Sequence, residues 1–335
     1  MKITRILVAI SFLFAVSNVN AGELTVTGNM EATYQSQTDG NTGNPIGMDR
    51  ELKFAATTEL DSGITVSVMQ DTNDSLTYGN SQLAFGNIMG MGTVYVGSDS
   101  DPLDAIDDVT PSAYEEATGS GSGTYVDIGS AAGQMGLGLK LALPIAGTNL
   151  NYKYYPQLDS VKNADNANSG VGTTAGSGQS FNLKTNFGDI ISELSGLTLN
   201  AGIGEYQTAA VATTDDKLEM TAALNYAYGP IKIGYQKKYN ALGETVVGTT
   251  VAKHTDDIYG IAYAINDSLS ISYNRYDSER NINLGANPEQ STTAYNIGYT
   301  IGGMSIGFQD ASTDNAGYVK DVSDDTRTLG VTVAF

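Results

Sequence analysis

The chain has 335 residues and carries 37 acidic against 17 basic residues, which gives a net charge of −20 near neutral pH. An anionic chain of this kind repels nucleic acid and acidic lipid surfaces, so a basic binding patch is excluded and nucleic acid is not expected as a partner. Cysteine is absent, which excludes disulfides, thiol catalysis and cysteine-bound metal ions.

The first 21 residues have the pattern of a cleaved signal peptide. Lys2 and Arg5 stand before an apolar stretch from Ile6 to Val16, and Ala21 ends a small-residue cleavage site. Cleavage after Ala21 would leave 15 basic against 37 acidic residues, a net charge of −22. No later apolar run approaches the roughly 18 to 20 residues of a spanning helix. We therefore predict an exported chain with a signal peptide over residues 1–21.

Residues 22–335 predict one all-β domain, because segment after segment alternates apolar and polar side chains with a period of two. The sixteen predicted strands are Leu24–Gln35, Arg50–Leu60, Ile64–Asp71, Ser81–Asn87, Thr93–Gly97, Gln134–Leu143, Asn149–Leu158, Gln179–Phe187, Leu197–Tyr206, Lys217–Tyr228, Ile231–Tyr239, Asp256–Ile265, Leu269–Tyr276, Thr292–Ile301, Met304–Gln309 and Asp325–Phe335. This strand content predicts a transmembrane antiparallel β-barrel.

The connections between the predicted strands alternate in length. Short ones such as Gly229-Pro230 and Gly302-Gly303 follow long ones such as Ser98 to Gly133 and Asp159 to Gly178. This alternation puts short turns on one rim and long loops on the other. Outer-membrane barrels have that asymmetry, with short periplasmic turns and long external loops.

The two rows of side chains on most strands differ in chemistry. One row is bulky and apolar, for example at Leu137 and Leu139. The other row is small or polar, for example at Gly138 and Lys140. A soluble β-sandwich would also alternate, but the signal peptide and the turn asymmetry favour a barrel with its apolar row against lipid and its polar row toward water.

Aromatic residues gather at the ends of the predicted strands. The chain has 20 tyrosines and no tryptophan. The terminal positions are Tyr34, Tyr78, Tyr154, Tyr206 and Tyr239 beside long loops, and Phe85, Phe187, Tyr228 and Phe335 beside short turns. Rings at both rims predict the aromatic girdles of a membrane barrel, although mid-strand positions such as Tyr235 and Tyr273 are used as well.

The chain resembles the general porins of Gram-negative bacteria. The resemblance rests on sixteen strands, an oversized third loop over residues 98–133, the passage from Val96 to Pro111, and a last alternating strand that stops at Phe335. It implies that the third loop folds into the lumen and that three barrels form a homotrimer. It also implies a location in the cell outer membrane among lipid and lipopolysaccharide, with Phe335 as part of the signal read by the barrel assembly machinery.

The third loop lies in a stretch without any basic residue, between Lys53 and Lys140. If residues 98–133 enter the lumen, eight carboxylates line or flank the narrowest part of the pore. These are Asp99, Asp101, Asp104, Asp107, Asp108, Glu115, Glu116 and Asp127. Rings of acidic side chains favour cations in a water-filled pore. A solvated, acidic external loop is the alternative reading.

Seven lysines fall on the polar rows and are predicted to face the lumen. They are Lys53, Lys140, Lys153, Lys184, Lys217, Lys232 and Lys238. Related porins set a cluster of arginines opposite the loop acids, but here only Lys53, with Arg50 nearby, comes from the early strands. Because this basic cluster is small, we expect a weak transverse electric field across the pore, and an anion-selective pore is less favoured.

Signals for catalysis and for cofactors are weak. The one histidine, His254, is expected in a solvated loop, which leaves a Ser/His/Asp arrangement without support. Gly170 to Ala175 matches a dinucleotide fingerprint, but it lies in a loop rich in Ser, Asn and Gly. We expect no cofactor. Oxygen ligands for Ca²⁺ are present at Asp99-Ser100-Asp101, Asp107-Asp108 and Asp324-Asp325, and this alternative stays open although no twelve-residue calcium loop is present.

These features together predict a passive diffusion channel for small hydrophilic solutes and ions, with a preference for cations. A substrate-specific porin and a structural or adhesive outer-membrane barrel are the alternatives that share the fold. A barrel enzyme would have to depend on His254, so we predict that the chain is not an enzyme.

Overall fold

The structure, a computed structural model, describes residues 23–335 except 39–42, 73–77, 89, 91, 100, 146, 159–175, 208–215, 244–250 and 283–284. The predicted signal peptide lies outside these residues and stays a prediction, as does any role for Gly170 to Ala175. In the described part of the chain, no helix is long and apolar enough to cross a membrane.

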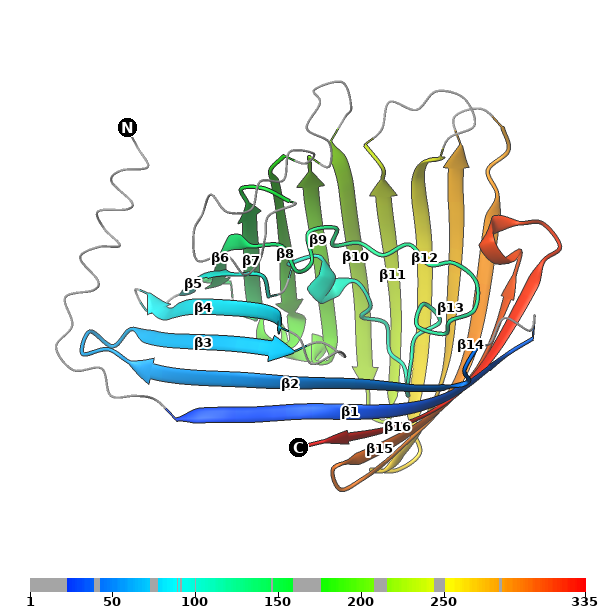
Figure 1. Cartoon of the computed structure of the whole chain (residues 1–335), viewed down its shortest axis with the longest axis horizontal. Helices are drawn as coiled ribbons and strands as arrows, with labels where there is room; N and C mark the ends of the chain where they lie inside the picture. The colour runs from blue at the N-terminus through cyan, green and yellow to red at the C-terminus, as the bar shows by residue number, and fades with distance from the viewer. Residues whose placement is uncertain are drawn as a thin grey trace.

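Sixteen strands form one closed antiparallel barrel in chain order, with β1 paired to β16 (Figure 1). The strands are β1 Leu24–Gln37, β2 Ile46–Glu59, β3 Thr65–Thr72, β4 Tyr78–Ile88, β5 Gly92–Gly97, β6 Gly136–Ala142, β7 Thr148–Tyr155, β8 Gly178–Asn186, β9 Leu197–Tyr206, β10 Lys217–Tyr228, β11 Ile231–Ala241, β12 Val251–Ala264, β13 Leu269–Ile282, β14 Glu289–Ile301, β15 Met304–Asp314 and β16 Ser323–Ala334. Short 3₁₀ helices are η2 Asp104–Ile106, η3 Phe187–Asp189, η4 Ser192–Leu194 and η5 Ala316–Tyr318. The prediction of a sixteen-stranded barrel is confirmed.

The barrel closes at Gly28 and Phe335. Gly28 N donates to Phe335 O at 2.9 Å, and Phe335 N donates to Gly28 O at 3.0 Å. A Cβ at Gly28 would lie 2.9 Å from Cζ of Phe335, so the missing side chain leaves room for the phenyl ring over β1. Phe335 therefore pairs with the first strand while its side chain stays on the outer surface.

The outward row of side chains is apolar at the middle of the barrel wall. Val68, Leu137, Ile233 and Ile261 each expose between 45 and 49% of their surface. The rows between them are small or polar and face the lumen, as they do in membrane barrels whose outer surface meets lipid.

Several strands, among them β12 to β15, extend further toward the loop rim than their sequence patterns predict. β12 begins at Val251 instead of Asp256, and β13 ends at Ile282 instead of Tyr276. β14 and β15 are also longer on this side. Polar residues such as Asp257 and Asp277 occupy the outward row there, so both faces are polar and the period of two is lost. Backbone pairing nevertheless continues, because it does not depend on side-chain polarity.

On β11 to β14, tyrosines mark the edge of the apolar band on the side of the long loops. The Tyr235 and Tyr259 rings lie 5.2 Å apart, and the Tyr273 and Tyr295 rings lie 5.3 Å apart. Because these strands continue beyond the apolar band, tyrosines in the middle of a strand lie at the edge of the band and form part of a girdle. The prediction that Tyr206 joins a girdle is wrong, because its side chain is fully buried on the inside of the barrel.

Candidate pore constriction

The third loop, residues 98–135, runs inside the barrel between the end of β5 and the start of β6 (Figure 1). Its backbone follows the inner face of the wall twice. The outbound half, up to Glu116, runs from β7 toward β16, and the return half, from Ser120, runs back along the same strands. Each half is attached by side chains that the wall strands direct inward, as the following contacts show.

Asp101 anchors the start of the loop. Its carboxylate accepts hydrogen bonds from the hydroxyls of Tyr155, Ser180 and Tyr206 and from Leu103 N. The side chain is fully buried. Burial raises the pKa of Asp101 above its usual value, and the hydrogen bonds oppose that rise. A buried carboxylate is tolerated here because four protein donors surround it.

Amide side chains on β11, β13 and β15 hold the outbound half. Gln236 on β11 donates to the carbonyl of Ile106 at 2.9 Å. Asn274 on β13 donates to Pro111 O at 2.9 Å. Gln309 on β15 donates to Glu115 O at 3.0 Å and to Glu116 O at 3.1 Å. These amides satisfy backbone carbonyls that would otherwise need water inside the lumen.

Inward glycines let the loop lie close to the wall. A Cβ at Gly202 would lie 2.7 Å from Leu103 Cδ2, and one at Gly260 would lie 2.6 Å from Pro111 O. The Tyr114 ring fills the space at Gly307. Its hydroxyl then donates to Glu31 Oε1 on β1 at 2.8 Å. The outbound half thus reaches the first strand.

The return half is attached to the same wall in reverse order. Thr326 on β16 donates to Ser120 O at 2.9 Å, and Gln290 on β14 bonds both backbone groups of Thr124. Asn240 on β11 donates to Asp127 O at 2.9 Å. Glu219 on β10 then accepts from Gly129 N at 2.7 Å and from Ser130 N at 3.1 Å. The loop contacts the inner face from β7 through β16 to β1, so the part of the wall that it leaves open to the lumen lies toward β2 to β6.

Two small apolar clusters lie between the loop and the wall. One contains Leu103, Ile106, Ile128, Ala131, Tyr155, Leu158 and Tyr206. The other contains Ala117, Ile258, Tyr276, Ala294 and Ala311. Burial of a side chain such as Leu103 contributes about 1.5 to 3 kcal/mol. The loop is therefore held by apolar packing as well as by hydrogen bonds.

The eight loop carboxylates do not share one environment. Asp104, Asp108 and Asp127 are exposed, whereas Asp99, Glu115 and Glu116 are half-buried. Asp101 and Asp107 are buried. The expectation that all eight line or flank the constriction is wrong for Asp101, because its carboxylate is enclosed by protein donors. Asp107 is ion-paired to the wall and presents little charge to water.

The half-buried glutamates have raised pKa values. Burial, with Glu31 and Asp108 nearby, raises the pKa of Glu115 to about 6. Burial, with Asp108 and Glu115 nearby, raises the pKa of Glu116 to about 7. Because like charges and desolvation both disfavour the ionised form, these two side chains titrate close to neutral pH.

All seven predicted lysines lie on inward rows, but three of them serve the loop. Lys238 is 1% exposed and pairs with Asp107 at 2.6 Å and with Asp108 at 3.1 Å. Lys217 pairs with Glu219 at 2.8 Å, and Lys153 is buried with its Nζ 3.0 Å from Asp99 O. The ammonium groups of Lys238 and Lys217 are compensated by carboxylates, and that of Lys153 is held against a backbone carbonyl away from the open lumen.

The other four lysines are less enclosed. Lys140, Lys184 and Lys232 are exposed and lie near the turn ends of β6, β8 and β11. Lys53 on β2 is half-buried. Arg50, which the sequence places beside Lys53 in the small basic cluster, stands on the outward row of β2, opposite Met30. A one-residue step along a strand changes the face, so Arg50 adds nothing to a transverse field.

His254 lies in β12 and not in a solvated loop. It is 6% exposed, and its Nδ1 lies 3.3 Å from the Tyr318 hydroxyl. That hydroxyl is 2.7 Å from Oγ of Ser278. Within the described chain, His254 thus reaches Ser278 only through Tyr318, and the direct contact of a base with a nucleophile is missing. The cluster instead attaches the β15–β16 loop to the wall.

Metal-ligand geometry is absent from the described residues, where no group of three or more His, Asp or Glu side chains could hold a metal ion. Asp101 is surrounded by hydroxyl donors, and Asp107 and Asp108 share Lys238. Ser100 lies outside the described residues. These acids therefore already have protein partners.

The sequence pattern did not reveal the residues that fix the loop. Gln236, Gln290, Gln309 and Glu219 stand on inward rows where any polar residue is compatible with a water-filled lumen. Their partners are backbone groups more than 80 residues away. The one available signal was the high frequency of amide side chains on those rows.

A closed barrel with an apolar outer band, a polar lumen and an internal loop is a membrane-spanning pore protein. The chain belongs to the Gram-negative porin family, because the sequence model of that family matches residues 7–302. This membership also gives the location, the outer membrane. No curated protein sequence matches the chain significantly.

Several solved structures share the fold. The trimer form of OmpT from Vibrio cholerae is 12% identical, with a TM-score of 0.69, and the match covers 94% of this chain and 100% of that chain. An anion-selective porin from Comamonas acidovorans is 13% identical with a TM-score of 0.65, and coverage is again 94% and 100%. OmpF of Salmonella typhi, in complex with daunomycin, is 12% identical with a TM-score of 0.64 and coverage of 94% and 98%. At these identities the likeness shows the fold alone.

Proposed function

We propose that the protein is a passive diffusion channel for small hydrophilic solutes and ions that prefers cations. The observation that carries the proposal is the exposure of Asp104, Asp108 and Asp127 on a loop inside the lumen. The nearby wall lysine, Lys238, is compensated by two acids. Fixed carboxylates without free basic partners attract cations into a narrow aqueous passage.

The size of the effect is sufficient to bias ion flow. Two charges about 4 Å apart interact by about 1 kcal/mol in bulk water and by about 4 kcal/mol at an effective dielectric constant near 20. A partly hydrated constriction lies between these limits. Screening at high salt shortens the reach of the carboxylates and reduces the preference.

Fold likeness alone does not decide the sign of the selectivity, because one similar structure is an anion-selective porin. The distribution of charge in this chain favours the cation-selective alternative. The three exposed lysines lie near the turn rim, whereas the exposed carboxylates lie on the loop. The resulting pore would be acidic where it is narrow.

The assembly and the partners follow from the same proposal. A similar structure is a trimer form, which supports a homotrimer here. Outer-membrane lipid and lipopolysaccharide would contact the apolar band, and the barrel assembly machinery would read the strand that ends at Phe335. Removal of residues 1–21 would precede insertion. Diffusion requires no cofactor and no catalytic group, so we retain the prediction that the chain is not an enzyme.

Single-channel recording in planar bilayers tests the proposal. The purified, folded protein should conduct, and the reversal potential in a salt gradient should have the sign of a cation-selective pore. A structural or adhesive barrel would not conduct. A pore that saturates with one solute would indicate a substrate-specific porin, and an anion-selective reversal potential would contradict the proposed charge preference.

A further inference from the structure

Three exposed lysines stand on inward rows near the turn rim of the barrel. They are Lys140, Lys184 and Lys232. None of them is in register with an acidic residue on a neighbouring strand. Within the described part of the chain, none lies within ion-pair distance of a carboxylate. Their charges are therefore open to the water in this part of the lumen.

Strand positions put these lysines between the internal loop and the turns. Asn182 on β8 donates to Pro102 O of the loop, and Lys184 is the next inward residue toward the turn. On β11, Gln236 donates to a loop carbonyl, and Lys232 lies beyond it, next to the first residue of the strand. Lys140 likewise lies near the turn end of β6. The lysines thus follow the constriction along the pore.

Other charges on the turn side are few or balanced. Lys53 on β2 stands directly opposite Asp71 on β3. Within the described strands, Glu59 is the one acidic residue on an inward row at a turn end. Four more exposed acids lie in the turns themselves, where bulk salt screens them: Asp61, Asp189, Glu193 and Asp267. The inward rows on this side therefore carry a positive balance.

The opposite sign prevails at the internal loop. Asp104, Asp108 and Asp127 are exposed there, and the wall lysine beside them, Lys238, is paired with Asp108 and with the buried Asp107. Rings of fixed charge select ions of the opposite sign. The lumen thus has an acidic zone at the loop and a basic zone toward the turns, so the charges are separated along the pore and not across it.

We infer that the pore rectifies current and conducts better when the loop side is positive. With that polarity, cations enter through the acidic zone and anions enter through the basic zone. Both ions accumulate where the zones meet, so the conductance rises. With the opposite polarity both ions are drawn out of this region, and the conductance falls. The inference rests on the proposed function, because it requires an open pore with an acidic constriction, and it adds a direction to that function.

The asymmetry depends on salt. The Debye length is about 10 Å at 0.1 M salt and about 3 Å at 1 M, so fixed charges reach across a narrow pore only in the first case. We expect the currents at equal and opposite voltages to differ about twofold near 0.1 M, and to be nearly equal near 1 M.

The test is the current–voltage curve of single channels of the folded full chain, with the same salt on both sides of a planar bilayer. Because the chain lacks cysteine, a biotin-labelled Gly303→Cys variant can mark the turn side. A Cβ at Gly303 would lie 3.4 Å from Ala334 O, an ordinary contact distance. Streptavidin should block this variant from the turn chamber alone, and the larger current should flow when the loop chamber is positive.

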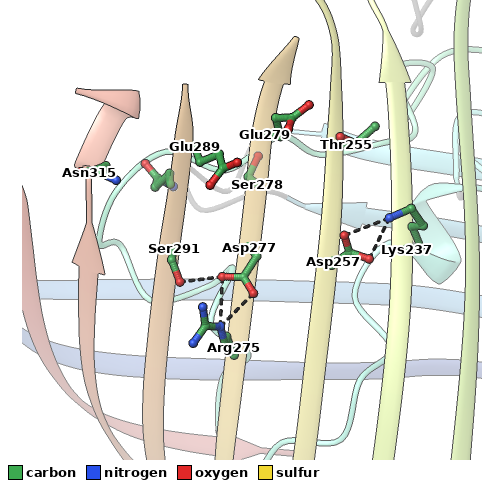
Figure 2. A pocket seen from close by; sticks show the side chains of 11 residues that line it. Lys237, Thr255, Asp257, Arg275, Asp277, Ser278, Glu279, Glu289, Ser291 and Asn315 are labelled. Carbon is green, nitrogen blue, oxygen red and sulfur yellow. Dashed lines mark hydrogen bonds and ion pairs between the residues drawn. The ribbon is translucent and has the colours of Figure 1, made fainter. Parts of the chain in front are cut away.

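The matched variants each remove three exposed basic side chains. Lys140→Gln, Lys184→Gln and Lys232→Gln together should make the curve nearly linear, while the reversal potential in a salt gradient stays cation-selective. The control is Lys237→Gln with Arg275→Gln and Arg327→Gln, which changes the outer surface. There Lys237 pairs with Asp257 and Arg275 with Asp277, as Figure 2 shows, and Arg327 pairs with Asp310. The control should rectify like the parent protein.

Each outcome decides the inference. A linear curve for the parent protein near 0.1 M, a larger current with the turn side positive, or an asymmetry that persists near 1 M would overturn it. Rectification that survives in the lumen variant, or that is lost in the control, would overturn it as well. A linear curve with a cation-selective reversal potential rejects the inference and leaves the proposed function intact, whereas a barrel that does not conduct rejects both.

Discussion

Nζ of Lys238 lies 2.6 Å from Oδ1 of Asp107, with the lysine side chain 1% exposed. Asp108 approaches the same ammonium group at 3.1 Å. This contact ties β11 to the middle of the internal loop. It also compensates the charge of a wall lysine beside the exposed loop acids, so Lys238, which the sequence predicts as a pore charge, instead attaches the loop to the wall.

Lys238→Met should loosen the internal loop. Removing one partner of a buried ion pair leaves an uncompensated charge and costs about 3 to 5 kcal/mol, reduced here to the extent that Asp107 becomes protonated. We expect faster proteolytic cleavage within residues 98–133 and a lower urea midpoint of unfolding. Lys232→Met is the control, because Lys232 is exposed on the same strand. Equal cleavage rates for the two variants would show that the ion pair does not hold the loop.

Tyr155→Phe should destabilise the start of the loop. The change removes a hydroxyl donor from the buried carboxylate of Asp101 and leaves that acceptor less satisfied, at a cost of about 1 to 3 kcal/mol. The measurement is the urea unfolding midpoint in lipid vesicles. Tyr154→Phe, on the outward row next to it, should leave the midpoint unchanged. The anchoring role of Asp101 is contradicted if both variants unfold alike.

Gly307→Ala should push the loop into the pore. A methyl group at this position would overlap the Tyr114 ring, so the ring and the adjacent backbone must move inward. Single-channel conductance should fall relative to the parent protein. Gly86→Ala is the matched control, because a Cβ at this inward glycine on β4 would meet its nearest atom at 3.5 Å, an ordinary contact distance. Unchanged conductance in Gly307→Ala would mean that the loop does not limit the pore.

The cation preference should fall as the pH is lowered from about 8 to about 5. Glu116 has a pKa of about 7 and Glu115 of about 6, so both lose their negative charge across this interval. The reversal potential in a salt gradient reports the change. Glu115→Gln with Glu116→Gln should reduce the pH dependence of the reversal potential over the same interval, with a remainder from Asp107, because burial raises the pKa of that carboxyl to about 7. A double variant that retains the full pH dependence would assign the titration to other groups.

The strands could be predicted because the wall has a simple period. Each strand at mid-barrel alternates lipid-facing residues such as Ile233 and Ile261 with lumen-facing ones such as Gln236 and Lys238. The inward positions of all seven lysines follow from the same alternation. The pattern failed on β13 after Tyr276, because Asp277 and Glu279 make the outward row polar beyond the apolar band.

The positions of the loop acids could not be predicted in the same way. The internal loop has no repeating backbone geometry, so neighbours such as Asp107 and Asp108 can differ in exposure without any sequence signal. Asp101 differs from the exposed acids through its hydrogen bonds with Tyr155 and Tyr206, and these two tyrosines are distant in sequence. Composition indicated an acidic loop, but only the three-dimensional contacts separate anchoring carboxylates from exposed ones.

The reversal potential of a triple variant tests the central claim most directly. Asp104→Asn, Asp108→Asn and Asp127→Asn remove the three exposed loop carboxylates and leave the anchors at Asp101 and Glu219 intact. At low salt, where screening is weak, the reversal potential should shift toward anion selectivity while the conductance shows a folded, open pore. A reversal potential identical to that of the parent protein at low salt would contradict the claim that this loop sets the ion preference.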